Sequence, residues 1–138
     1  MIIKGIQEED FINYKKPSMF IGTSICDWKC CNEQCLDKNI CQNSSLANSK
    51  TIDISADEIY RRYINNPITK SIVIGGLEPM LQFSDVLELI KTFRNNDCND
   101  DIVIKYGRYI PDQKEHYDEV LGVYLASSNQ YAERISND

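Results

Sequence analysis

The stretch that decides the fold is Ser71-Ile72-Val73-Ile74-Gly75-Gly76, a short apolar run that ends in two glycines. β-Branched residues bounded by glycine are typical of a buried strand. Helical patterns lie on both sides of it. A capping box at Ser55-Ala56-Asp57-Glu58 predicts a helix that runs to about Asn65. Apolar residues at helical spacing predict a second helix over 84–94.

Further strands are predicted outward from this unit, at 101–106 after the second helix and at 1–6 and 18–22 before the first. Strands that alternate with helices indicate parallel βα units. We therefore expect an α/β fold with a mainly parallel sheet of about four strands. Ligands of such sheets bind at the carboxyl ends of the strands. The glycine pair and the segment that follows residue 22 would be neighbours there.

Length and composition limit the possible classes of protein. A chain of 138 residues is expected to form a single domain, 1–138. The net charge of −6 argues against a nucleic-acid binder, which needs a basic surface. No apolar run approaches the roughly 18 residues of a membrane span. The sequence MIIKGIQEED carries acidic residues where a signal peptide needs an apolar core, so a cytoplasmic location is expected.

The cysteines are concentrated in one polar segment. Five of the six fall within residues 26–41, inside a stretch far longer than an ordinary connection, and Cys98 stands alone. Clustered thiols in a chain without an export signal favour a metal site over a disulfide framework. Thiolates bind either zinc or an iron–sulfur cluster, and the spacing alone leaves both open. The clustered residues are Cys26, Cys30, Cys31, Cys35 and Cys41.

Three runs of residues carry a family resemblance. They are MFIGTSICDWKC at 19–30 with Ile40-Cys41-Gln42-Asn43 after it, SIVIGGLEP at 71–79, and ASSNQ at 126–130. In this order they resemble the cluster loop, the SAM-binding strand end and the C-terminus of small members of the radical SAM superfamily, which activate anaerobic ribonucleotide reductases. The resemblance covers most of the chain.

The resemblance implies a [4Fe-4S] cluster held by Cys26, Cys30 and Cys41. One iron would stay open to the amino and carboxylate groups of S-adenosylmethionine (SAM). Ten residues separate Cys30 from Cys41, where the family usually has two. Cys31 and Cys35 fall in this insertion and are therefore alternative ligands.

The resemblance also implies a set of SAM-binding residues. Ile40 would contact the adenine, and Asn43 completes the same motif. Gly75, Gly76 and Glu78 would lie near the SAM amine, where the absence of a Cβ lets backbone carbonyls come close. A tight turn after the strand explains the two glycines equally well. Leu77 separates them from Glu78, so Gly76 is the stronger candidate.

The activity implied by the resemblance is that of a radical SAM oxidoreductase. The reduced cluster would cleave SAM to a 5′-deoxyadenosyl radical, which would install a glycyl radical in an anaerobic ribonucleoside-triphosphate reductase or a similar partner. An electron donor would be a second partner. The alternative is a non-catalytic iron–sulfur or zinc-binding module derived from this family. Compared with the family the chain lacks one βα unit, so the expected fold is a shortened partial (β/α) barrel, with an open sheet edge covered by 121–126 or by a second subunit.

Overall fold

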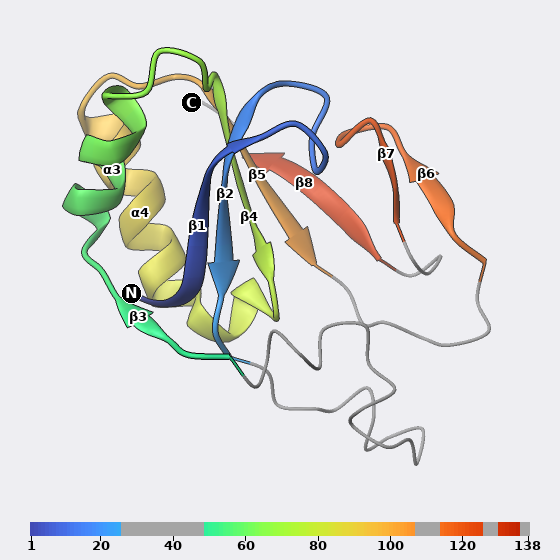
Figure 1. The fold of residues 1–138 in the computed structure, drawn as a ribbon, viewed down its shortest axis with the longest axis horizontal. Coiled ribbons are helices and arrows are strands. Elements are labelled where there is room, and N and C mark those ends of the chain that lie inside the picture. The colour runs from blue at the N-terminus through green and yellow to red at the C-terminus, as the bar shows by residue number, and fades with distance from the viewer. Residues whose placement is uncertain (26–48, 107–113, 126–129, 136–138) are drawn as a thin grey trace.

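Strands and helices alternate through the middle of the chain, and strands follow at its end (Figure 1). The computed structural model describes residues 1–25, 49–106, 114–125 and 130–135. The elements in chain order are β1 (Ile2–Asp10), β2 (Ser18–Thr23), β3 (Ile52–Asp53), α3 (Ala56–Ile64), β4 (Ser71–Gly76), the 3-10 turn η2 (Pro79–Gln82), α4 (Phe83–Asn95), β5 (Asp101–Tyr106), β6 (His116–Asp118), β7 (Val123–Leu125) and β8 (Tyr131–Ile135).

Six of these strands form one mixed sheet in the order β3-β1-β2-β4-β5-β8, and β6 and β7 form a separate two-stranded sheet. β2, β4 and β5 are parallel, with Ile21 opposite Ile74 and Ile74 opposite Ile104. The outer pairs, β3 with β1, β1 with β2, and β5 with β8, are antiparallel. The predicted βα units therefore occupy only the centre of the sheet.

The expected fold class is wrong. The sheet has six strands with three antiparallel pairs, and it is not a mainly parallel, four-stranded partial barrel. Parallel neighbours need a long crossover, whereas only the short segment 11–17, without a helix, joins β1 to β2. At the other side, β8 returns antiparallel along β5 and covers the edge that we expected 121–126 to cover.

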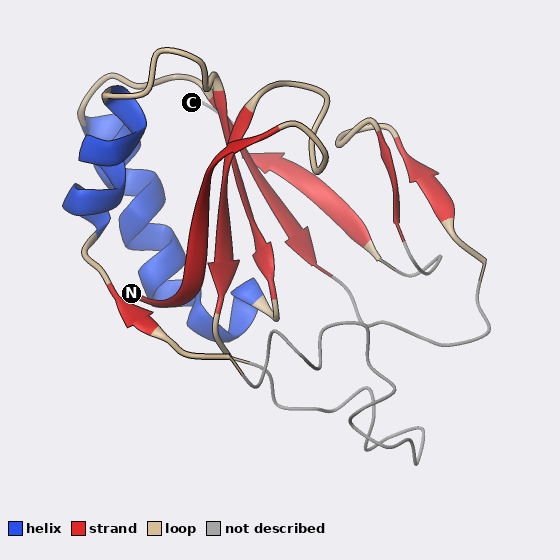
Figure 2. Cartoon of the chain, viewed as in Figure 1, coloured by secondary structure: helices blue, strands red, loops and turns tan. Residues whose placement is uncertain are grey.

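The helices α3 and α4 lie on one face of the large sheet (Figure 2). The capping box is confirmed in part, because the Ser55 side chain accepts a hydrogen bond from the Glu58 backbone N–H at 3.1 Å. Phe93 of α4 is fully buried and makes edge contacts with the rings of Tyr60 and Tyr63 of α3. Burial of this apolar face is the main force that holds the helices on the sheet. The strand residues beneath them are Ile3, Met19, Ile21, Ile72, Ile74, Ile102 and Ile104.

A second, smaller core lies on the opposite face of the sheet. Val73 and Val103 point there because successive strand residues alternate between faces. They pack with Tyr14 from the segment between β1 and β2, and with Leu121 and Leu125 from the β6–β7 hairpin. The centre of the sheet is thus covered on both faces. Among the residues that the structure describes, no helix is long and apolar enough to cross a membrane.

Candidate metal centre

The predicted metal ligands Cys26, Cys30, Cys31, Cys35 and Cys41 lie outside the described residues, as do Ile40 and Asn43. The structure does describe the residues on both sides of this cysteine segment (26–48), namely Ile25 and Ser49. It also describes Gly75, Gly76 and Glu78. The residues that hold the two ends of the cysteine segment are called its frame, and they define the position of the site.

The start of the cysteine segment is hydrogen-bonded to the glycine turn. The Thr23 hydroxyl, at the end of β2, donates to the Gly75 carbonyl at 2.6 Å, and the Leu77 N–H donates to the Thr23 carbonyl at 3.4 Å. One residue further, the Glu78 N–H donates to the Ile25 carbonyl at 3.0 Å. The carboxyl ends of β2 and β4 are therefore joined, as the sequence predicts for neighbouring parallel strands.

Gly76 is required by the neighbouring strand. Its φ of +85° lies in the left-handed region, and a Cβ there would stand 2.8 Å from the Thr23 nitrogen and 2.9 Å from the Gly22 Cα. A Cβ at Gly75 would meet the Phe20 ring at 3.1 Å. Close packing against β2 thus accounts for both glycines, and their contacts with a ligand stay predictions.

Glu78 closes the turn that follows the glycines. It is the N-cap of η2, where its carboxylate accepts from the Met80 N–H at 3.4 Å. Carboxylates are favourable at this position because the first amides of a helical turn lack intrahelical partners. Its backbone meanwhile holds Ile25, so Glu78 has a structural role at this edge. Its contact with a SAM amine stays a prediction.

Gln82 was missed by the sequence reasoning. It is the last residue of η2 and is buried. Its side-chain oxygen accepts from the Ser24 backbone N–H at 3.0 Å, and its amide nitrogen donates to the Ile2 carbonyl at 2.8 Å. The Ser24 hydroxyl donates to the same Ile2 carbonyl at 2.7 Å. β1, the end of β2 and η2 therefore meet at one point, two residues before Cys26.

The far end of the cysteine segment returns to the same strand. The Lys4 ammonium donates to the Ser49 carbonyl at 2.5 Å. β3 then pairs antiparallel with the first residues of β1, with Ile2 opposite Asp53 and Ile3 opposite Ile52. Both ends of the segment are thus attached to residues 2–4 of β1.

Exposed apolar side chains lie beside the start of the cysteine segment. A shallow depression there is lined by four exposed residues, Ile25, Met80, Leu81 and Phe83.

Lys105 lies next to Gly75, on the face of the sheet opposite to α3 and α4. Burial lowers the pKa of Lys105, and the nearby carboxylates of Asp10 and Asp118 partly offset this effect.

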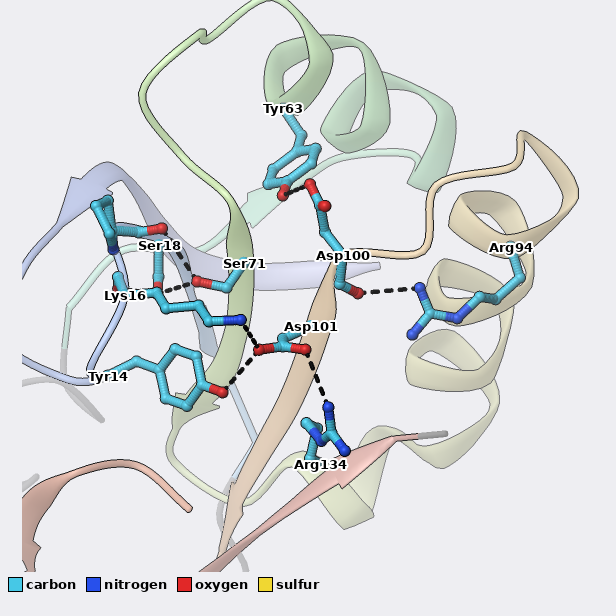
Figure 3. Close-up of polar contacts among 10 residues, drawn as sticks. Tyr14, Lys16, Ser18, Tyr63, Ser71, Arg94, Asp100, Asp101 and Arg134 are labelled. Atoms are coloured by element: carbon cyan, nitrogen blue, oxygen red, sulfur yellow. Dashed lines mark hydrogen bonds and ion pairs between the residues drawn. The ribbon is translucent and has the colours of Figure 1, made fainter. Parts of the chain in front are cut away.

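At the amino ends of the parallel strands β4 and β5, charged side chains bond to one another (Figure 3). The Asp101 carboxylate, at the start of β5, accepts hydrogen bonds from Lys16 at 2.6 Å, from the Tyr14 hydroxyl at 2.9 Å and from Arg134 at 3.3 Å. We call these four residues the Asp101 cluster. Burial opposes ionisation of Asp101, but the hydrogen bonds from Lys16, Tyr14 and Arg134 and the charge of Lys16 together outweigh it and lower the pKa of the carboxyl. Burial and the bond to Asp101 raise the pKa of Tyr14 to about 12.

Metal donors are not gathered elsewhere in the described chain. In residues 1–25, 49–106, 114–125 and 130–135, no three His, Cys, Asp or Glu side chains lie together in a way that could hold an ion. Cys98 is a free, half-buried thiol that packs against the core near Phe93. The donor set that suits an iron–sulfur cluster is the group of thiols that the sequence places in the cysteine segment.

Comparison with known protein families supports an iron–sulfur cluster. Residues 20–124 of the 138 match the profile of the 4Fe-4S single cluster domain. The matched region runs from β2 to β7 and contains the cysteine segment, the glycine turn and Gln82. No curated protein and no solved structure gives a significant match.

Proposed function

Because the chain belongs to the family of 4Fe-4S single cluster domains, we propose that Cys26, Cys30 and Cys41 bind a [4Fe-4S] cluster. Cys31 and Cys35 are the alternative ligands. Three thiolates leave one iron without a protein ligand, and that position is available to a substrate. This vacancy distinguishes the proposal from a purely structural zinc site, which takes four protein ligands.

We further propose that the open iron binds SAM and that the protein is a radical SAM oxidoreductase. A bound and reduced cluster would supply the electron that cleaves SAM to methionine and a 5′-deoxyadenosyl radical. The protein holds the cosubstrate: Ile40 and Asn43 from the cysteine segment, and Gly75, Gly76 and Glu78 from the end of β4. The apolar residues beside Ile25 would help to exclude water.

One observation carries this proposal. The hydrogen bonds from Thr23 to Gly75 and from Glu78 to Ile25 bring the start of the cysteine segment and the predicted SAM-binding turn to the same edge of the sheet. The two motifs are separated by dozens of residues in sequence, so their meeting is a property of the fold. A cluster and a cosubstrate that share one iron need this proximity.

The proposed protein substrate is a glycyl radical enzyme such as an anaerobic ribonucleoside-triphosphate reductase, and the cluster would receive its electron from a donor protein. The sequence likeness at 126–130 supports this choice of partner. A cytoplasmic location, where such a partner would be met, stays a prediction.

A second candidate is a non-catalytic iron–sulfur or zinc module. The antiparallel pairing of β8 with β5 favours it, because a further parallel strand is expected at that position in a partial barrel. Because β8 runs antiparallel to β5, the amino end of β8 lies beside the carboxyl end of β5, where a parallel strand would place its carboxyl end. Cluster binding depends mainly on the segment between β2 and β3, so it would tolerate this change better than SAM cleavage would.

The two candidates are separated by EPR spectroscopy of anaerobically reconstituted, dithionite-reduced protein, with and without SAM. We expect a four-iron signal that changes when SAM is added, together with formation of 5′-deoxyadenosine. The Cys26→Ser variant should lose the signal, whereas Cys98→Ser, which alters the thiol outside the segment, should keep it. A signal indifferent to SAM would favour the binding module, and zinc without iron would exclude the radical chemistry.

A further inference from the structure

Gln82 is a polar side chain in an unusual place. It is 5% exposed, although its neighbours in sequence, Leu81 and Phe83, are apolar and 42% and 56% exposed. Within η2, Gln82 and Pro79 are thus buried, whereas Met80 and Leu81 are exposed. Burial of an amide is costly unless its donor and acceptor are both used. Here both are, and neither partner is within η2.

The partners of Gln82 are backbone groups at two strand ends. Its oxygen takes the N–H of Ser24 where β2 has just ended, and its nitrogen reaches the carbonyl of Ile2 at the start of β1. The Ser24 hydroxyl lies 3.5 Å from the same Gln82 oxygen and bonds to Ile2 as well. The three residues form a closed triangle of hydrogen bonds, which fixes the backbone at Ser24.

We propose that Gln82 is a positioning residue for the cluster. Its oxygen binds the Ser24 N–H and its nitrogen binds the Ile2 carbonyl. These two bonds set the direction in which the chain leaves β2 toward Cys26, two residues on. It touches no ligand itself and acts only through the backbone. The inference rests on the cluster-binding part of the proposed function and adds to it the residue that orients the first thiolate. Removing a group that is hydrogen-bonded directly to a metal ligand commonly costs about ten- to a hundredfold in metal affinity, and we expect Gln82, which acts through the backbone, to lie at the low end of that range.

The test is the Gln82→Met variant, in which a side chain of similar length can make neither hydrogen bond. Wild-type and variant protein are loaded anaerobically with iron and sulfide, and the rate of cluster loss to an iron chelator is followed by absorbance. We expect loss at least about tenfold faster than in wild type, with an altered EPR line shape of the reduced cluster. Gln82→Glu keeps an oxygen acceptor for Ser24 and should lose its cluster at an intermediate rate.

Tyr63→Phe is the matched control, because it removes one side-chain hydrogen bond, to Asp100 at 2.6 Å, at the other end of the sheet. It should retain the cluster like wild type. The inference is overturned if Gln82→Met keeps wild-type loss kinetics and EPR signal, or if Tyr63→Phe loses the cluster equally fast. These results leave the proposed function intact, whereas a wild-type protein that takes up no cluster overturns both. If Gln82→Met fails to fold, Gln82→Glu measured against Tyr63→Phe decides.

Discussion

The two ends of the parallel strands are held in different ways. At the amino ends of β4 and β5 the Asp101 cluster uses ionised side chains from three separate segments (Figure 3). At the carboxyl ends the contacts around Thr23, Ser24 and Gln82 are made by backbone groups, hydroxyls and one amide. The Asp101 cluster bonds side chains to one another, whereas each of these contacts at the carboxyl ends includes a backbone group.

This difference matches what each end has to do. Ion pairs between long side chains tolerate small shifts, and they depend on pH and salt. Hydrogen bonds to the backbone fix where the chain runs and do not titrate. Thiolate ligands make a cluster site negatively charged, and the contacts of Thr23, Ser24 and Gln82 at its base add no further negative charge. The following predictions test whether the two ends are as distinct as this comparison suggests.

The largest effect is expected for Gly76→Ala at the carboxyl end. The new Cβ would stand 2.8 Å from the Thr23 nitrogen and would be held at a positive φ. Left-handed backbone and overpacking together should lower the free energy of unfolding by about 3 kcal/mol. Urea denaturation measures this. Gly5→Ala in β1, where nothing lies within 4 Å of the new Cβ, is the control and should change little. Equal losses in both variants would show that crowding against β2 is not the cause.

A smaller effect is expected for Asp101→Asn at the amino end. The variant weakens contacts with Lys16, Tyr14 and Arg134, of which the two cations are largely exposed. We therefore expect a loss of about 1–2 kcal/mol at pH 7. Asp53→Asn, whose side chain is 84% exposed, should be close to neutral. A loss at Asp53 as large as at Asp101 would contradict the assignment.

The same variant gives a pH test. The pKa of Asp101 is lower in the folded protein, so its stabilisation is complete above the ordinary carboxyl pKa of about 3.9. It is lost as the pH falls below that value and through the lowered folded pKa. The stabilities of wild type and Asp101→Asn should converge in this acid range. A constant difference down to that range would mean that Asp101 does not titrate as its surroundings indicate.

The smallest effects are expected for a matched pair of hydroxyl deletions. Thr23→Val removes the bond to the Gly75 carbonyl, and Ser18→Ala removes bonds to Lys16 and Ser71 at the other end. Each should cost about 1 kcal/mol in the metal-free protein. After cluster loading, only Thr23→Val should speed chelator-driven cluster loss, by about threefold. If Ser18→Ala has the same effect, cluster retention follows overall stability instead of the geometry of the carboxyl edge.

The centre of the fold was predictable because its signals are local. The run at 71–76, the capping box at Ser55 and the apolar spacing over 84–94 each define one element without reference to the rest of the chain. The direction of the outer strands is not local. β8 has only five residues, of which two are charged, and its place on β5 depends on pairing with residues about thirty positions earlier, such as Ile102 with Ile135. Together with the two antiparallel pairs of β1, that pairing makes the predicted parallel sheet a mixed one.

The parts of the site that residue type alone reveals could be recognised from the sequence. Clustered cysteines and a glycine pair identify themselves, and the position of the glycine pair beside the start of the cysteine segment is confirmed. Gln82 carries no such signal, since glutamine between Leu81 and Phe83 is typical of a solvent-exposed position. Its burial follows from the packing of η2 against Ser24 and Ile2, which only the tertiary structure determines.

The triangle at Ile2 has a consequence for the order of folding. Its hydrogen bonds connect Ile2 with residues 22 and 80 positions later, and β3 adds a pairing with Asp53. Contacts of long sequence separation pay a large loop-closure entropy and form slowly. During synthesis all five clustered cysteines leave the ribosome well before Gln82 does. The thiols are therefore present for some time before their frame is complete, and we expect a stable metal centre to be one of the last features that the nascent chain acquires.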